Sequence, residues 1–344
     1  MLTVDPLDYP FADVPAPGQA WQVAPGLYWA RIPLPFRLDH VNVWLIDEDD
    51  GWTVIDAGCA NEVSRDAWAT LISGPMKGGR IRRVIATHGH VDHVGLIGEL
   101  VARHDSDFCA TFGEWAWARM SHIHDVPGAI DTLRSYHLRN GLDPALIEAM
   151  IANRRGFIDL SVPLPGWLNA LRDRGTVAMG GRDWDIIVTG GHAHEHSAFH
   201  DPAGGVLIVG DQILPRISPA ITVLEMVPDG DPLDEFLRSF DRFSHVADDA
   251  LVLPSHGRPF RGLHSRMADL AAHHHDRLDA VRGLLHSPRT AIDLMRLLFP
   301  RVTDVEQTGF ALGETLAHVN WLLHRGQVVV EDAGAPVRRY RAVA

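Results

Sequence analysis

Three histidines and one aspartate crowd residues 88–93, in the run His-Gly-His-Val-Asp-His that directly follows a strand-like run. Residues two apart in an extended segment project to the same side, so we expect His88 and His90 to bind one metal ion together. Asp92 and His93 come where the backbone turns into a predicted helix, and we expect them to reach a second ion beside the first. Imidazole and carboxylate are ligands that zinc, manganese and iron share. The spacing therefore predicts a metal site and leaves the metal open.

This motif, His-x-His-x-Asp-His, resembles the signature of the metallo-β-lactamase superfamily, a group of hydrolases that includes glyoxalase II-like thioesterases. The resemblance covers about residues 20–262 and implies an α+β fold, a four-layer αββα sandwich. Five metal-motif segments occur in the order that the family shows, and four of them directly follow apolar strand-like runs. We regard this repeated placement as the strongest functional signal in the sequence.

The third motif of the family is carried by residues 190–196, Gly-Gly-His-Ala-His-Glu-His. By the resemblance, His192 is the metal ligand, because it follows a strand and the small residues that let backbone approach a metal. His196 matches the second histidine of the motif, which usually binds no metal. His194 lies between them and is the alternative ligand. The position of His192 after Gly191 favours His192.

Three further positions complete the site that the resemblance implies. Asp56 ends a predicted strand and would steady a ligand histidine, since a metal-bound imidazole needs an acceptor for its other N–H; a plain turn-forming aspartate is the alternative. We count Asp56 with Asp92 as the catalytic candidates. Asp211 follows an apolar run and is the candidate bridge between two cations, which a neutral imidazole cannot be. His256, again just past a strand, supplies the last ligand.

The completed site predicts a dinuclear metal-dependent hydrolase. Two divalent metal ions are the expected cofactors, with zinc favoured and iron or manganese as alternatives. Cations about 3.5–4 Å apart lower the pKa of bound water towards about 7, which provides a bridging hydroxide for attack on a small thioester, ester or lactone. Asp92 would also orient this hydroxide. Arg258 is a candidate anchor for a substrate carboxylate, or else a surface arginine. The expected ligands of the first ion are His88, His90 and His192; those of the second are Asp92, His93 and His256; Asp211 bridges the two.

Two other reactions stay open for the same motif. One is phosphodiester cleavage of RNA by a metal-dependent endoribonuclease, as in ribonuclease Z-like relatives. The net charge of −13 counts against a nucleic-acid partner, because phosphate binding needs a basic face. The other is persulfide oxidation at a mononuclear iron centre. Metal analysis separates that reaction from hydrolysis, and a small-molecule substrate is favoured.

Length and composition place the protein among ordinary globular chains. Its 344 residues suit one large domain plus a small one. Cys59 and Cys109 are too few for a disulfide scaffold and indicate a reducing compartment. No apolar run approaches the ~20 residues that span a bilayer. Residues 1–17 are acidic and proline-rich, unlike a secretory signal. We therefore expect a cytoplasmic protein with no membrane partner.

We divide the chain into a catalytic domain at residues 1–262, a connecting helix at 263–285 and a winged-helix-like domain at 286–344. Residues 113–175 of the first domain are predicted to form a helical insert that packs over or beside the metal pocket. The histidines at positions 122, 124 and 137 of this insert are expected on helix surfaces, with a substrate contact as the alternative. In the run of histidines at 273–275, only His274 falls on an apolar helical stripe, so a solvated run is favoured over a metal site.

The C-terminal pattern of helix, helix and hairpin resembles a winged helix, a fold that often binds DNA. Its presumed recognition helix offers Glu314, His318 and Asn320 before it reaches Arg325, which is a poor phosphate-binding face. We therefore expect this region to be a packing or dimerisation module, which makes a homodimer one expected assembly.

Overall fold

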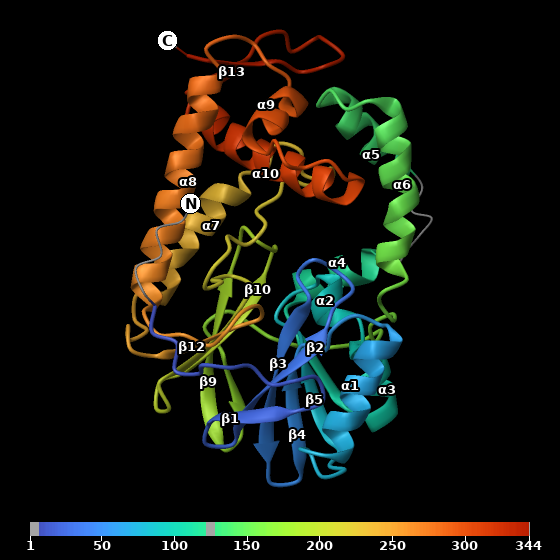
Figure 1. The fold of residues 1–344 in the computed structure, drawn as a ribbon, viewed down its shortest axis with the longest axis vertical. Helices are drawn as coiled ribbons and strands as arrows, with labels where there is room; N and C mark the ends of the chain where they lie inside the picture. The colour runs from blue at the N-terminus through green and yellow to red at the C-terminus, as the bar shows by residue number, and fades with distance from the viewer. Residues whose placement is uncertain (1–6, 122–127, 344) are drawn as a thin grey trace.

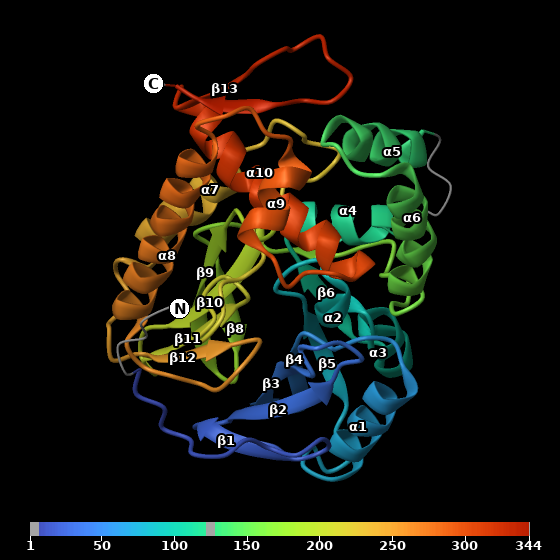
Figure 2. The ribbon, with the colours of Figure 1, turned by 45° about the horizontal axis from the view of Figure 1, so that its top comes forward.

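The computed structural model describes residues 7–121 and 128–343. Two β-sheets face each other in it, as Figures 1 and 2 show. The larger sheet has the strand order β1-β2-β3-β4-β5-β6-β7, with bounds Ala20–Ala24, Leu27–Pro33, His40–Glu48, Gly51–Ile55, Ile81–Ile85, Asp107–Ala110 and Asn169–Ala170. The smaller sheet has the order β12-β11-β10-β9-β8, with bounds Leu251–Pro254, Val206–Gly210, His196–Asp201, Arg182–Thr189 and Thr176–Met179.

Several strands of the two sheets are buried on both faces, and this explains why runs such as β3, β11 and β12 are apolar without a polar alternation. In β3, Trp44 faces the core between the sheets, whereas Val43 and Leu45 pack against the outer helices. Helices on both outer faces complete the four layers (Figure 2). The predicted αββα sandwich is therefore confirmed. The larger sheet is covered by α1 (Glu62–Ser73) and α3 (Ile97–His104), and the smaller by α7 (Pro232–Ser239) and α8 (Leu263–Leu284).

Parallel strand pairs bring the predicted site residues to one edge of the sandwich. β4 pairs with β5 in parallel, and β11 pairs with β12 in the same way. Parallel neighbours end at the same edge of a sheet. Asp56 follows β4, the 88–93 motif follows β5, Asp211 follows β11 and His256 follows β12. Residues far apart in the sequence therefore meet where these strands end.

Helices from two other parts of the chain lie over this edge. In Figure 1, α10 crosses one end of the molecule between α8 and α6. Buried leucines of α10 belong to the same core as Leu207 and Val209 of β11, so this helix packs on the smaller sheet's core. The helices concerned are α4 (Phe112–Ser121), α5 (Ala129–Arg139), α6 (Pro144–Ile158) and α10 (Val305–His324). α9 (Ala291–Leu298) and the hairpin of β13 (Val328–Val330) and β14 (Tyr340–Ala342) complete the C-terminal region and pack beside α10.

The C-terminal order of two helices and an antiparallel hairpin agrees with the predicted pattern. The winged-helix resemblance and the domain boundaries stay predictions. Within residues 7–121 and 128–343, no helix has both the length and the apolar character needed to cross a bilayer.

Candidate metal centre

Three imidazole rings converge at the end of β5. His88 Nε2 lies 2.8 Å from His90 Nδ1 and 3.2 Å from His192 Nε2. Burial and the neighbouring His192 lower the pKa of His90 to about 3, and burial likewise holds the pKa of His88 well below its usual range. The rings are therefore neutral and offer lone pairs, the form in which imidazole binds a metal. His88, His90 and His192 thus lie together, as the sequence predicts for the first ion.

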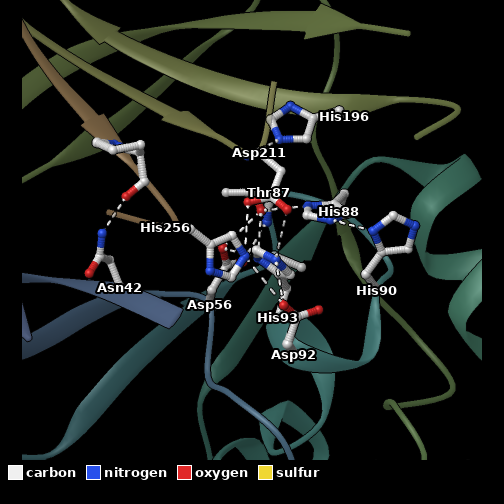
Figure 3. A network of polar contacts seen from close by, with 12 residues as sticks. Asn42, Asp56, Thr87, His88, His90, Asp92, His93, His196, Asp211 and His256 are labelled. Carbon is white, nitrogen blue, oxygen red and sulfur yellow. Dashed lines mark hydrogen bonds and ion pairs between the residues drawn. The ribbon is translucent and has the colours of Figure 1, made fainter. Parts of the chain in front are cut away.

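A second group of donors lies beside the first. Asp92 Oδ2 is 3.5 Å from His93 Nε2 and 3.4 Å from His256 Nε2. Asp211 lies between the two groups: its Oδ1 is 3.3 Å from His256 Nε2, and its Oδ2 is 3.5 Å from His192 Nε2. Figure 3 shows Asp92, His93, Asp211 and His256 gathered in one place from separate loops. The structure therefore brings all seven predicted ligands into one cluster.

The donors of this cluster fit a bound cation. His93 Nε2, His256 Nε2 and Asp211 Oδ1 are buried and have no hydrogen-bond partner among the described residues. An unpaired buried polar group costs about 1–3 kcal/mol, so three converging ones need a common partner. Burial opposes protonation of His256, but the carboxylates of Asp211 and Asp92 outweigh it and raise its pKa to about 10. The same negative charge attracts a metal ion.

Asp56 holds one ligand in place and does not itself point at the cation position. Its carboxylate accepts a hydrogen bond from His93 Nδ1 at 2.8 Å, which leaves His93 Nε2 directed at the cluster. The same carboxylate accepts from the backbone N–H and the hydroxyl of Thr87, each at 2.8 Å. Asp56 is fully buried and adopts a positive φ of 62°, a strained conformation that these bonds stabilise. Asp56 is therefore a positioning residue.

Thr87 has a role that the sequence reasoning missed. Its hydroxyl donates to Asp56, so at 3.0 Å it can only accept from His88 Nδ1. This hydrogen bond leaves His88 Nε2 as a lone pair aimed at the other two rings. In the sequence, the only indication of this role was the position of Thr87 directly before the 88–93 motif.

Backbone carbonyls orient two other ligands. His192 Nδ1 donates to the carbonyl of Ala220 at 2.9 Å, and His256 Nδ1 donates to that of His40 at 2.7 Å. A fixed acceptor on one ring nitrogen sets the tautomer and directs the other nitrogen to the metal. Sequence patterns do not reveal such acceptors, because any residue carries a carbonyl.

Glu114 of α4 joins the two loops that carry the first three ligands. Its buried carboxylate accepts from the backbone N–H of Gly89 and from that of Glu195, each at 2.7 Å. His196, the predicted non-ligand histidine, lies outside the ligand groups, and its Nε2 accepts from the backbone N–H of Asp211 at 3.1 Å. His194 also lies outside them, against Trp117. Glu114 and His196 therefore position the ligand loops.

The connecting helix α8 also supports the site. Arg266 is buried and donates to the carbonyls of Leu214 and Ile217, at 2.6 and 2.9 Å. His274 is fully buried, and its Nε2 lies 3.1 Å from the hydroxyl of Ser218. Both residues hold the loop between Asp211 and Ala220. The burial of His274 agrees with its predicted place on the apolar stripe of the helix, and His275 is exposed, as expected of a solvated run.

Arg258 has a different place from the one proposed for it. Its Nη1 donates to the carbonyls of Phe11 and Ala12, at 3.2 and 2.9 Å, and its guanidinium lies 4.5 Å from the ring centre of Tyr9. The chain turns at Gly257, where φ is 87°, and directs the arginine to the N-terminal segment. We therefore do not retain Arg258 as a substrate anchor. The Cys59 thiol is buried, and burial raises its pKa, so it is not a nucleophile.

A cavity of about 1180 Å³ opens at the cluster and is lined by five of the seven predicted ligands. Its other walls come from the segment 35–38, from α6 through Asn153 and Phe157, and from α10 through Val305 and Phe310. The prediction that the helical insert packs over or beside the metal pocket is confirmed. His122 and His124 lie outside the described residues. His137 is buried, so the expectation that it is a surface histidine is wrong.

Comparisons with known proteins agree with this geometry. Residues 36–256 match the family model of the metallo-beta-lactamase superfamily, and residues 278–343 match that of the metallo-beta-lactamase-like C-terminal domain. The chain is similar to the crystal structure of a beta-lactamase domain protein from Burkholderia ambifaria, with 40% identity, 98% of both chains covered and a TM-score of 0.90. A metallo-beta-lactamase family protein from Thermus thermophilus is 28% identical, with 94% of this chain and 100% of that chain covered and a TM-score of 0.79. The Bacillus subtilis protein YqjP, described as a probable metallo-hydrolase, is 27% identical over 85% of this chain and 90% of its own.

Proposed function

Because this chain belongs to the metallo-β-lactamase superfamily and is a metal-dependent hydrolase, we propose that it holds two divalent cations and cleaves a small thioester, ester or lactone. The observation that carries this proposal is the position of Asp211. One of its carboxylate oxygens faces His256 of the second donor group, and the other faces His192 of the first. A carboxylate shared in this way suits two neighbouring cations, which is the arrangement for hydrolysis.

The donor set consists of five imidazoles and two carboxylates, which suits zinc and also allows iron or manganese. When bound, the cations would supply Lewis acidity and would lower the pKa of water to about 7. The chain's own residues do the rest. Asp56 and Thr87 hold His93 and His88, and the Asp92 carboxylate is placed to orient a water and accept its proton. The walls from α6 and α10 leave room for a small molecule, which supports a small-molecule substrate.

Metal analysis and a substrate panel test this proposal. The purified protein is loaded with zinc, manganese or iron in separate samples, and each is assayed on a thioester, an ester, a lactone and a phosphodiester. Two metal equivalents and turnover of one of the first three substrates are expected. One iron per chain with oxygen uptake, or cleavage of the phosphodiester alone, would overturn the proposal.

The substitution His88→Ala ties any activity to the cluster. It should lower metal content and abolish turnover, whereas His275→Ala should change neither, because His275 is exposed on α8. Full activity in His88→Ala would refute the ligand assignment. A homodimer stays a prediction, which light scattering can measure.

A further inference from the structure

A second, smaller cavity adjoins the metal cavity, and we call it the side pocket. It has a volume of about 390 Å³ and shares six lining residues with the metal cavity, among them His90 and Phe157. From His90 it extends between the insert helices α4, α5 and α6 on one side and α10 on the other. One substrate can therefore place its reacting group at the metal cluster and another part of the same molecule in the side pocket.

We propose that the side pocket binds a medium-length acyl chain, so that the substrates are acyl thioesters, esters or lactones with an aliphatic tail. This inference rests on the proposed hydrolase function. The lining is mostly apolar and includes Leu133, Met150, Phe157 and Phe310. Apolar walls with few polar groups select ligands by buried hydrophobic surface.

The charged side chains of the side pocket pair with each other, and the other polar groups that line it are uncharged. Arg154 and Glu225 lie 3.8 Å apart and balance each other's charge. The hydroxyl of Tyr136 donates to the carbonyl of Val223 at 2.9 Å. His137 is buried and neutral, since burial lowers its pKa to about 4. An ionic group in the pocket would lose its hydration without gaining an uncommitted opposite charge, so an uncharged chain is favoured.

Two glycines on one face of α10 set the width of the side pocket. Gly309 and Gly313 are four residues apart and so lie on the same side of the helix. A Cβ on Gly309 would lie 3.1 Å from Met150 Cε, and one on Gly313 would lie 2.9 Å from Thr222 Cβ. Each glycine weakens a helix by about 1 kcal/mol relative to alanine. Close contact along this wall therefore accounts for their presence.

Substitutions at Met150 test the pocket, because this flexible side chain is partly buried in its wall. The assay is kcat/KM for a series of acyl substrates with one leaving group, from acetyl to dodecanoyl. The wild type should gain about fourfold per added methylene until the pocket is full. Met150→Trp should lower kcat/KM for the longest acyl chains by about tenfold and leave the acetyl substrate within about twofold. Met150→Ala should shift the optimum to longer chains.

The control is Leu138→Trp, which adds the same ring at an exposed position of α5. It should leave the chain-length profile unchanged. A flat profile in the wild type, or the same profile in Met150→Trp as in the wild type, would overturn the inference while leaving hydrolysis established.

A binding measurement keeps the inference testable if no panel substrate is hydrolysed. Calorimetry compares decanoate with acetate on the metal-loaded protein. Tighter binding of decanoate that is lost in Met150→Trp upholds the pocket even where the proposed function fails. Equal binding of the two carboxylates, or decanoate binding that Met150→Trp leaves unchanged, refutes it.

A separate observation carries a second inference, on the outer face of the smaller sheet. Asp185 of β9 and His200 of β10 are directly opposite each other in the antiparallel ladder. His245, which follows the turn of 3-10 helix η1 (Phe240–Phe243), places its ring 5.5 Å from that of His200. Their donor atoms all lie within 4.8 Å of one another.

We infer that Asp185, His200 and His245 bind a zinc ion distinct from the metal centre. His200 is only 6% exposed, and its Nδ1 has no hydrogen-bond partner among the described residues. The nearest carboxylate oxygen, on Asp185, is 4.0 Å away, too far for a hydrogen bond. Burial lowers the pKa of His200, so the ring is neutral and can bind a metal. Two imidazoles and one carboxylate leave a fourth tetrahedral position for water.

Zinc stoichiometry tests this second site. Samples are dialysed against micromolar zinc and measured by mass spectrometry of the metal. His245→Ala should hold one equivalent less than the wild type, and His286→Ala, at another exposed histidine, should hold the same amount. His245 is exposed, so its loss should not unfold the protein. Equal zinc in wild type and His245→Ala would overturn the site.

Discussion

The edge of the sandwich and the helices that cover it are built by different forces. At the edge, hydrogen bonds orient four of the seven predicted ligands: Thr87 holds His88, Asp56 holds His93, and carbonyls hold His192 and His256. We call the helices that lie over this edge, α4, α5, α6 and α10, the cover. In the cover, α6 and α10 meet mainly through apolar side chains such as Met150. Directional bonds place an atom within a few tenths of an ångström, whereas apolar packing sets mainly volume. Substitutions in the cover can therefore change which substrate binds, while the metal ligands at the edge and the reaction that they support stay the same.

Of the changes considered, loss of the Asp211 carboxylate should reduce metal binding and activity the most. Asp211→Asn removes a negative charge that faces both donor groups, so we expect kcat/KM to fall by about 10³-fold, since metal ions contribute several kcal/mol of transition-state stabilisation. Metal content should fall as well. The matched control is Asp279→Asn on the exposed side of α8. Retained activity and metal in Asp211→Asn would contradict the bridging role.

A cavity in the cover should cost stability without touching the metals. Ile147 of α6 is fully buried in the core that α6 shares with α10. Ile147→Ala should lower the free energy of unfolding by about 3 kcal/mol, measured with urea, while metal content stays at the wild-type level. Val63→Ala, at an exposed position, serves as the control. A loss of metal in Ile147→Ala would show that the two regions are not separable.

A change at Asp56 tests positioning within the edge. Asp56→Asn weakens the acceptor for His93 Nδ1 and should reduce metal affinity by about 10- to 100-fold. The readout is competition with a chelator, and KM should change little because Asp56 does not touch substrate. Asp47→Asn, at an exposed strand position, should behave as wild type. Unchanged metal affinity would leave Asp56 with a purely structural role.

Glu114 connects the two regions, because it belongs to α4 and its carboxylate binds the ligand loops. Glu114→Gln should weaken metal binding by about tenfold, since an amide presents one acceptor where the two N–H groups need two. Glu62→Gln, on the surface of α1, is its control. If Glu114→Gln changes the preferred acyl chain length but not metal affinity, Glu114 shapes the substrate pocket and does not support the metal ligands.

The smallest expected effect is a dependence of stability on pH, caused by Glu314 in the cover. Burial raises the pKa of Glu314 on α10 to about 7, against the opposing charge of Arg277. The folded protein then holds a proton that the unfolded chain releases near pH 4.5, so stability should fall as pH rises from about 4.5 to 7. Glu314→Gln should remove this fall in Tm, and Glu331→Gln should not. An identical pH profile in Glu314→Gln would exclude the assignment.

The sandwich and the ligand cluster could be predicted because their signals are local. A run such as β11 is apolar on both faces, and the residue after it, Asp211, is read directly from its position. The side pocket, the carbonyl of Ala220 and the actual place of Arg258 left no comparable pattern. Each depends on where a distant segment returns.

By itself, the sequence determined which side chains can bind metal and which strand each one follows, since residue type and hydrophobic pattern are properties of short segments. Only the tertiary structure decided that α8 holds the Asp211 loop through Arg266, and that α6 and α10 enclose a pocket beside His90. The physical reason is that packing between helices far apart in the chain depends on complementary shape, and many apolar sequences satisfy the same helical pattern.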